Sequence, residues 1–505
     1  MGRPMLVTFA GWARLANVAI VAAVVAGCST APPRASLGGL EKIEHIVVIY
    51  AENRSFDTLY GLFPGANGLA GAPATPQLDR DGTQLPVLPP VWKEDGTRDP
   101  AFPADLPNRP FRIDAPPVGL GLGVVTRDLV HRFYQHQEQL DGGRLDLFAA
   151  VSDAGGLTMG HYDGSGLPMW RWAKDYTLAD NFFMAAFGGS FLNHQWLACA
   201  CTPVSAGAPP SSRAQLDAEG RLKRSAKSPT SALEGPPSYV NDGAVTPDGY
   251  VVNTSQPPYQ PSGTPPAPGG DPRFADVSRN PVPPQTARTL GEALTERGVS
   301  WVWYAGAWSA ALADGSQAPG ATRMVIYNKV PGSPNFQPHH QPYDYFARYA
   351  PGTSERAAHL RDGGEFLTAI AAGTLPQVSF YKPQGNLNEH PGYADVLSGD
   401  QHIADLVARI RASSLWPTTA IIVTYDENGG LWDHVPPPAG DRWGPGSRIP
   451  AIVVSPYARR GFVDHTLYDT TSIHKLISRR FGLALLPGVR SNVGDLTAAF
   501  DFAPQ

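Results

Sequence analysis

Two continuous apolar runs, each followed by acidic residues, constrain the fold of this sequence more than any other feature. Residues 46–50 read IVVIY and residues 418–425 read TTAIIVTY. Runs rich in Val and Ile are typical of strands that are buried on both faces of a parallel sheet. Ligands of open parallel sheets bind outside the carboxyl ends of the strands, so the acids that follow both runs mark a candidate site.

Further runs of the same kind alternate with helical patterns. A third buried parallel strand is expected at 448–455. Weaker strands are expected at 300–304 and 377–381, and helices are expected at 286–297, 400–412 and 470–481. Asp400 is the expected N-cap of one helix, and Gly482 is the expected C-cap of the last. This alternation predicts an α/β protein with a mainly parallel central sheet flanked by helices.

Long loops are expected between these elements. Gly (53) and Pro (51) form about a fifth of the 505 residues, against about 12% in an average protein, which excludes a coiled coil or an all-helical bundle. Pro- and Gly-rich segments without periodicity occur at 64–118 and 203–284, with short strands expected near 249–253. We expect one domain over 41–490, with the second segment as its insertion, and a C-terminal tail over 491–505.

The N-terminus has the pattern of an export signal. Arg3 and Arg14 accompany a short apolar stretch that ends in Val25-Ala26-Gly27-Cys28, which resembles a bacterial lipobox. The resemblance implies a signal peptide over 1–27, lipidation of Cys28, a leader over 28–40, and a periplasmic protein anchored to the outer membrane. An ordinary secretory signal or an uncleaved anchor is the alternative. The net charge of −5 gives no indication of a nucleic-acid partner.

The two remaining cysteines, Cys199 and Cys201, are separated by a single alanine. A disulfide between such close neighbours requires a particular local geometry. We therefore expect two buried, unpaired small side chains rather than a disulfide, and the pairing itself stays open at this point.

Two clusters carry candidate chemistry. Glu52 and Asn53 follow the first apolar run, and Asp426 and Glu427 follow the second. Oxygen ligands of this kind suit a hard divalent ion such as Mg²⁺, Ca²⁺ or Mn²⁺, and the alternative is that they are ordinary loop acids. Ser190 lies in a Gly-Gly-Ser-Phe-Leu-Asn-His segment, where it is a candidate nucleophile or a helix N-cap.

Several histidines lie in polar or Pro-rich contexts. They are His131, His339, His340, His390 and His434. Imidazoles can neutralise a phosphoryl group and protonate a leaving oxygen. A serine, a hard metal and several histidines together favour phosphoryl transfer.

Two motifs and several scattered segments resemble one known family. Residues 52–57 (ENRSFD) and 426–438 (DENGGLWDHVPPP) resemble the bacterial phosphoesterases that include acid phosphatases and phosphatidylcholine-type phospholipases C. The segments that lean toward the acid phosphatase branch are 128–135, 178–183, 187–196, 336–342 and 386–395. Phospholipases of this family typically have a Thr-Asn-Pro-Asn-Arg-like run where this chain has 189–194.

The resemblance implies an alkaline-phosphatase-like fold and a site made of named residues. Glu52, Asn53, Asp426 and Glu427, together with Ser190, would hold one divalent metal ion of Mg, Ca or Mn type. Some acid phosphatases have Asp-Asp where this chain has Asp426-Glu427.

The same resemblance implies roles for the serine and the histidines. Ser190 would be the nucleophile, and His131, His340 and His390 would bind phosphoryl oxygens or protonate the leaving group. His339 is an alternative to His340 at this site. The roles of His434, Asn193 and His194 stay open.

The expected function is therefore hydrolysis of phosphate monoesters by an acid phosphatase through a phosphoserine intermediate. The alternatives are a phospholipase C and, less favoured, an inactive binding lipoprotein. Its partners would be a phosphate ester and the membrane that holds the lipid anchor, and the oligomeric state stays open.

Overall fold

A computed structural model describes residues 1–2 and 38–503 of the chain, and Cys28 with nearly all of the expected signal peptide lies outside these described residues. The central sheet has eight strands in the order β11-β4-β10-β9-β1-β8-β6-β7. These strands are β1 (His45–Ala51), β4 (Thr177–Ala179), β6 (Trp301–Ala305), β7 (Leu360–Asp362), β8 (Val378–Lys382), β9 (Thr419–Tyr425), β10 (Ala451–Val454) and β11 (Phe462–Asp464). Two short pairs, β2 (Phe111–Arg112) with β3 (Gly160–His161) and β5 (Phe182–Phe183) with β12 (Tyr468–Asp469), lie outside this sheet.

The predicted α/β class with a mainly parallel sheet is confirmed. β1 lies at the centre and pairs in parallel with β8 and with β9. Every residue of β9, and all but the first residue of β1, is buried, so both faces of the sheet are covered. The Val- and Ile-rich composition of both strands follows from that burial.

The expected parallel direction of the 448–455 strand is wrong. β10 runs antiparallel to both of its neighbours, β9 and β4. Residues 426–450, which join β9 to β10, contain no helix. A parallel crossover usually contains one, whereas this irregular connection brings the chain back in the opposite direction. The apolar run reports burial on both faces, which does not depend on strand direction.

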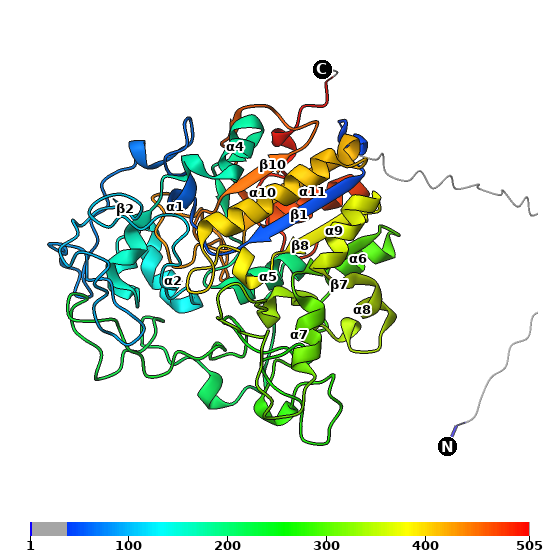
Figure 1. The fold of residues 1–505 in the computed structure, drawn as a ribbon. Coiled ribbons are helices and arrows are strands. Elements are labelled where there is room, and N and C mark those ends of the chain that lie inside the picture. The colour runs from blue at the N-terminus through cyan, green and yellow to red at the C-terminus, as the bar shows by residue number, and fades with distance from the viewer. Residues whose placement is uncertain (3–37, 504–505) are drawn as a thin grey trace, which may run out of the picture. The chain divides into compact units, whose positions relative to one another are not determined.

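Eleven α-helices occur in the described residues: α1 (Phe56–Tyr60), α2 (Phe133–Leu140), α3 (Phe148–Val151), α4 (Pro168–Asp175), α5 (Ser190–Cys199), α6 (Leu290–Glu296), α7 (Trp308–Gly315), α8 (Ser354–His359), α9 (Gly363–Ala372), α10 (Val396–Ala412) and α11 (Thr471–Phe481). In Figure 1, α9 and α10 lie in front of β1. α4 and α9 both contact α10, whereas α5 contacts α6 and α11.

One of the two expected helix caps agrees with the structure, and the other does not. α11 ends at Gly482 in the left-handed conformation, as expected of a C-cap. α10, however, begins at Val396, because the side chain of Asp395 accepts a hydrogen bond from the backbone N–H of Ser398 and caps the helix. Asp400 is therefore buried inside the helix and is not its N-cap, so that expectation is wrong.

The insertion over 203–284 consists of turns, two short 3₁₀ helices and isolated bridges. The strands expected near 249–253 occur as single bridges, which join Tyr250 to Val204 and Val251 to Val245. Within the described residues, no helix is both long enough and apolar enough to span a membrane.

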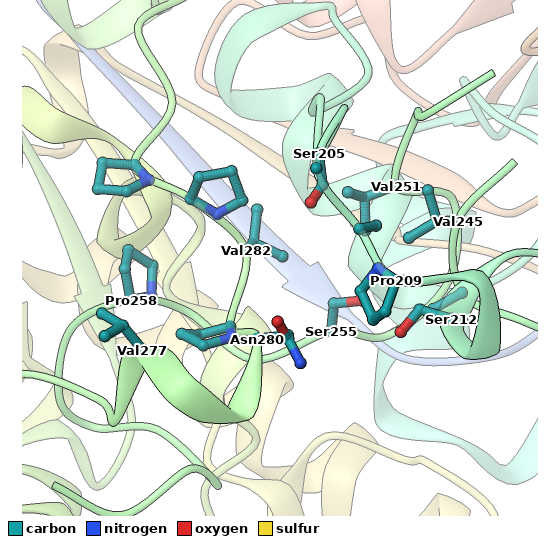
Figure 2. A pocket seen from close by; sticks show the side chains of 16 residues that line it. Ser205, Pro209, Ser212, Val245, Val251, Ser255, Pro258, Val277, Asn280 and Val282 are labelled. Atoms are coloured by element: carbon teal, nitrogen blue, oxygen red, sulfur yellow. The ribbon is translucent and has the colours of Figure 1, made fainter. Parts of the chain in front are cut away.

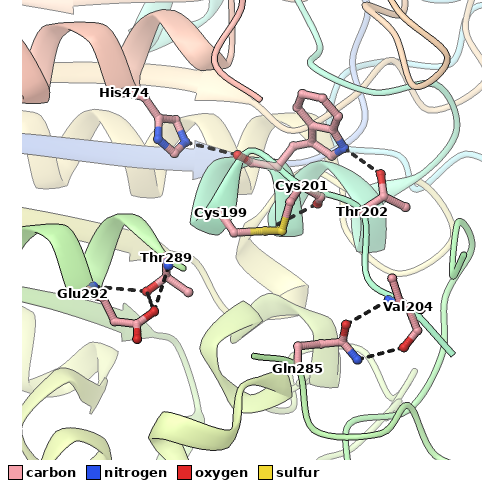
Figure 3. Close-up of a disulfide and its surroundings, with 9 residues drawn as sticks. Cys199, Cys201, Thr202, Val204, Gln285, Thr289, Glu292 and His474 are labelled. Atoms are coloured by element: carbon pink, nitrogen blue, oxygen red, sulfur yellow. Dashed lines mark hydrogen bonds between the residues drawn. A yellow bond between two sulfur atoms is a disulfide. The ribbon is translucent and has the colours of Figure 1, made fainter. Parts of the chain in front are cut away.

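The expectation that Cys199 and Cys201 are unpaired is wrong. The two residues form a disulfide with a Cα–Cα distance of 5.1 Å (Figure 3). Ala200 between them adopts the left-handed conformation at the end of α5, with φ of 47°. This residue turns the chain back on itself, so the local geometry that seemed unfavourable from the spacing is provided by the helix end.

Candidate active site

The acids that follow β1 and β9 meet at the carboxyl edge of the sheet. The register pairs Ala51 with Tyr425, so the residues that come next are neighbours. The backbone N–H of Asn53 donates to Oδ1 of Asp426 at 3.2 Å. All four expected metal ligands after these strands are fully buried: Glu52, Asn53, Asp426 and Glu427. The alternative that they are ordinary surface acids is therefore wrong.

Ser190 is brought to this edge by the start of α5. It is the first residue of the helix, and Gly189 occupies the N-cap position, so the N-cap alternative for Ser190 is wrong. A Cβ at position 189 would lie 2.6 Å from the carbonyl oxygen of His131. Glycine at this position therefore allows the loop that carries His131 to approach the serine closely.

Asn193 holds the turn that presents the serine. Its Nδ2 donates to the carbonyl oxygens of Ala186 and Gly189, and its Oδ1 accepts from the backbone N–H of Ala186. These bonds fix the chain on both sides of Gly188, which has φ of 89°. We therefore assign Asn193, whose role the sequence left open, to the stabilisation of this turn.

The hydroxyl of Ser190 lies among carboxylate and amide oxygens. Its Oγ is 3.1 Å from Oε2 of Glu52, 3.3 Å from Oδ1 of Asn53 and 3.3 Å from Oε1 of Glu427. One hydroxyl proton can be donated to one of these three acceptors at a time. The other two acceptor oxygens therefore lie near Ser190 without receiving its proton.

This oxygen cluster fits a hard divalent cation. Burial, together with the charge of Glu52, raises the pKa of Asp426 well above its usual value, and burial raises the pKa of Glu427 likewise. Oδ2 of Asp426 is buried and has no hydrogen-bond partner among the described residues. A bound cation of Mg, Ca or Mn type would stabilise the ionised forms and satisfy this oxygen.

Lys382 is a site residue that the sequence reasoning did not identify. It is the last residue of β8, fully buried, and its ammonium contacts Oε1 of Glu52. Burial by itself raises the pKa of Glu52, but the charges of Lys382 and His340 outweigh it and hold that pKa well below its usual value. A lysine at the carboxyl end of a predicted parallel strand is the signal that could have revealed it.

The charges of these groups suit one divalent cation. The carboxylates of Glu52 and Glu427 contact the Ser190 hydroxyl, that of Asp426 accepts from the backbone of the neighbouring Asn53, and the ammonium of Lys382 contacts Glu52. With all four groups ionised, two negative charges are left uncompensated in a buried position. One divalent ion would neutralise them.

His131 and His390 flank the same oxygens. Nδ1 of His131 lies 2.6 Å from the carbonyl oxygen of Leu129, and Nδ1 of His390 lies 2.5 Å from that of Pro391. Because a carbonyl can only accept, each Nδ1 is the protonated nitrogen. Nε2 of His131 is 3.7 Å from Oε1 of Glu427, and Nε2 of His390 is 3.9 Å from Oε2 of Glu52. Both Nε2 atoms therefore face the cluster and are available for proton transfer.

His340 lies in the site, as preferred over its neighbour. Its Nε2 is 2.7 Å from Oε1 of Glu52, and burial lowers the pKa of His340 to about 4. His194 stacks on it with ring centroids 5.3 Å apart, and His339 contacts both rings edge-on. Nδ1 of His194 lies 2.8 Å from the carbonyl oxygen of Ser190, so this imidazole contacts the main chain of the serine.

His434 belongs to a different buried network. Its Nδ1 lies 2.7 Å from Oδ2 of Asp57, and its Nε2 lies 3.1 Å from Oδ1 of Asn67. Arg448 donates to both Asp57 and Asp433 in the same network. The two carboxylates share this guanidinium, and His434 donates to Asp57 with its backbone N–H, so we assign His434 a structural role that holds the 426–438 segment against α1.

A cavity of about 400 Å³ opens beside the serine turn. Its wall includes His131, Gly189 and the segment 253–254. Two arginines of this wall are paired with acids, Arg127 with Asp153 and Arg132 with Asp242. A substrate whose phosphorus reaches Ser190 can therefore extend into a polar cavity whose positive charges are already compensated.

Asp128 is the acid of this cavity that lacks such a partner among the described arginines and lysines. Its Oδ1 has no hydrogen-bond partner among the described residues and lies 3.6 Å from Nδ1 of His131. The side chain is 40% exposed. Ligand atoms of Asp128, His131 and His390 lie within 4.8 Å of one another.

A serine hydroxyl among buried carboxylates, at the carboxyl edge of a parallel sheet and flanked by imidazoles, defines a hydrolase of phosphoric esters. The sequence model of the Phosphoesterase family matches residues 43–484, and the chain belongs to this family.

Relatives and solved structures are similar over most of the chain. Phospholipase C A of Mycobacterium tuberculosis is 26% identical over 92% of this chain and 78% of its own length. The non-hemolytic phospholipase C of Burkholderia pseudomallei is 25% identical over 99% of this chain and 65% of its own length. An alkaline phosphatase superfamily protein from Vibrio parahaemolyticus has a TM-score of 0.30 and 11% identity, covering 74% of this chain and 71% of its own. Murine ectonucleotide pyrophosphatase / phosphodiesterase 5 has a TM-score of 0.29 and 11% identity, covering 66% and 94%.

Proposed function

We propose that this phosphoesterase is a phospholipase C, which cleaves a phosphodiester whose head group is cationic. The carboxylate of Asp128, which pairs with no described arginine or lysine in the cavity beside Ser190 and lies 3.6 Å from Nδ1 of His131, carries the proposal. A monoester dianion would meet this negative charge, whereas the ammonium of a choline-type head group would be attracted to it. The relatives named phospholipase C support the same choice.

The described residues support a double displacement. Nε2 of His131 takes the proton of the Ser190 hydroxyl as Oγ attacks phosphorus, and passes it to the lipid oxygen as the bond from phosphorus to that oxygen breaks. In the second half, Nε2 takes a proton from the attacking water and passes it to Oγ as the bond from phosphorus to Ser190 breaks, which releases the head-group phosphate and restores the hydroxyl. His390 faces the same oxygens and is placed to orient the phosphoryl group.

The expected metal ligands complete this chemistry. A divalent cation held by Glu52, Asn53, Asp426 and Glu427 would lower the pKa of the Ser190 hydroxyl and offset the charge on the phosphoryl oxygens. The buried ammonium of Lys382 keeps Glu52 ionised and in place for this role.

A paired assay tests the proposed substrate class. We expect purified protein to hydrolyse p-nitrophenyl phosphorylcholine with a higher kcat/KM than p-nitrophenyl phosphate. The two compounds share a leaving group and differ in the choline. Preference for the monoester would contradict the proposal and would support the acid phosphatase that the middle segments of the sequence led us to expect.

Asp128→Asn should change kcat/KM for the two substrates differently. We expect kcat/KM for the choline diester to fall about two- to fivefold, the range of a partly exposed ion pair, and kcat/KM for the monoester to stay the same or rise. Glu94→Gln is a matched control, because Glu94 lines the same cavity with its side chain 75% exposed. An equal loss for both substrates in Asp128→Asn would show that Asp128 acts on the histidines and not on the head group.

We also propose that the protein is exported and held at the outer membrane by a lipid on Cys28. The lipobox-like sequence that ends at Cys28 supports this proposal. Cys28→Ser should move the protein from the membrane fraction to the soluble periplasmic fraction. Wild-type protein that incorporates no labelled palmitate would contradict it.

A further inference from the structure

An apolar pocket lies in the 203–284 insertion. Its volume is about 420 Å³, within the range of roughly 300–1,000 Å³ that is typical of small-molecule sites. Figure 2 shows Val245 and Val251 on one side of the pocket and Val277 and Val282 on the other. Val245, Val251 and Val282 are almost fully buried, whereas Val277 is 82% exposed at the rim.

The lining of this pocket favours an uncharged, largely apolar ligand. Five prolines and three serines join the valines, and no charged side chain of the described residues lines the pocket. The polar cavity beside Ser190 is the opposite, because three acids and two arginines line it. The two cavities therefore suit the two ends of an amphiphilic molecule.

One segment of the chain connects the two cavities. Asn253 and Thr254 line the polar cavity, and Ser255 lines the apolar pocket. Oδ1 of Asn253 accepts from the backbone N–H of Phe133, two residues after His131. The carbonyl oxygen of Ser255 accepts from the hydroxyl of Tyr345, whose ring contacts Phe191, the residue after the candidate nucleophile.

We infer that this pocket binds one hydrocarbon chain of the substrate while the phosphodiester lies at Ser190. The inference rests on the proposed phospholipase C function and adds a chain-binding subsite to it. The exposed rim at Val277 is the entrance through which a long chain would continue to solvent or to the membrane surface.

Binding of alkylphosphocholines to the Ser190→Ala variant tests the inference without turnover. Dissociation constants are measured by calorimetry below the micellar concentration for octyl, decyl, dodecyl and tetradecyl chains. A buried methylene is worth up to about a fourfold change in affinity, so we expect the dissociation constant to fall about two- to fourfold for each added methylene among the longer chains.

Two further substitutions in this background locate the chain. Ala208→Trp should fill the pocket, and Val277→Asp should place a charge at its rim. Either substitution should abolish the increase in affinity with chain length. Val330→Asp is the matched control, because Val330 is also exposed, at 57%, and does not line the pocket. A gain with chain length that survives Ala208→Trp, or the absence of any gain, would overturn the inference.

The same variants distinguish this inference from the proposed function. In the wild-type background, Ala208→Trp and Val277→Asp should leave the hydrolysis of p-nitrophenyl phosphorylcholine unchanged, because this substrate has no alkyl chain. Failure of the wild type to cleave that diester would contradict the proposed function alone. A chain-length effect that is located elsewhere would contradict the pocket alone.

Discussion

Ser190→Ala is expected to reduce kcat at least about a thousandfold while the protein stays folded. The hydroxyl is the nucleophilic group in the serine turn, and it lies 3.1 Å from Oε2 of Glu52. Alanine keeps the helix start intact, because Gly189 and the side chain of Asn193 shape the turn. The measurement is steady-state hydrolysis of p-nitrophenyl phosphorylcholine by metal-loaded protein.

Two controls show whether this loss is chemical. The temperature of unfolding of Ser190→Ala should remain close to that of the wild type. Ser398→Ala, an exposed position in the first turn of α10, should retain full activity. Turnover of Ser190→Ala within tenfold of the wild type would refute the nucleophile assignment.

Asp426→Asn is expected to weaken metal binding about tenfold to a hundredfold, the range measured even for residues that only support metal ligands. The carboxylate is fully buried, and its Oδ2 has no other partner among the described residues. Asparagine is nearly isosteric but removes one of the negative charges that a divalent cation would neutralise. The metal content after dialysis against a chelator and reloading, measured by elemental analysis, is the readout.

Asp405→Asn is the matched control for this experiment, since Asp405 is exposed on α10. It should bind the same amount of metal as the wild type. In both proteins the metal content is independent of turnover, so the result does not depend on the substrate chosen. Equal metal content in Asp426→Asn and the wild type would remove Asp426 from the ligand set.

The core of the fold and the acids of the site were predictable from the sequence. Strands buried on both faces must be apolar throughout, so β1 and β9 stand out as continuous runs, and the polar residues after them lie at one edge. For this reason the apolar runs alone assign Glu52 and Asp426 to one site, although the two residues are far apart along the chain.

Other features could not be predicted because they depend on local geometry or on contacts across the fold. The direction of β10 is set by the irregular connection that precedes it, and the Cys199–Cys201 disulfide depends on the left-handed Ala200. Lys382 ends a predicted strand, but its contact with Glu52 depends on the position of β8 beside β1. Pairwise contacts of this kind leave no periodic signal in a single sequence.

The stereochemistry of hydrolysis at phosphorus tests the double displacement most directly. A phosphorothioate diester of choline that is chiral at phosphorus is hydrolysed in isotopically labelled water, and the configuration of the product is determined. Two successive in-line displacements, first by Ser190 and then by water, each invert the configuration, so we predict overall retention. Overall inversion would show that water attacks the substrate directly and would contradict the phosphoserine mechanism.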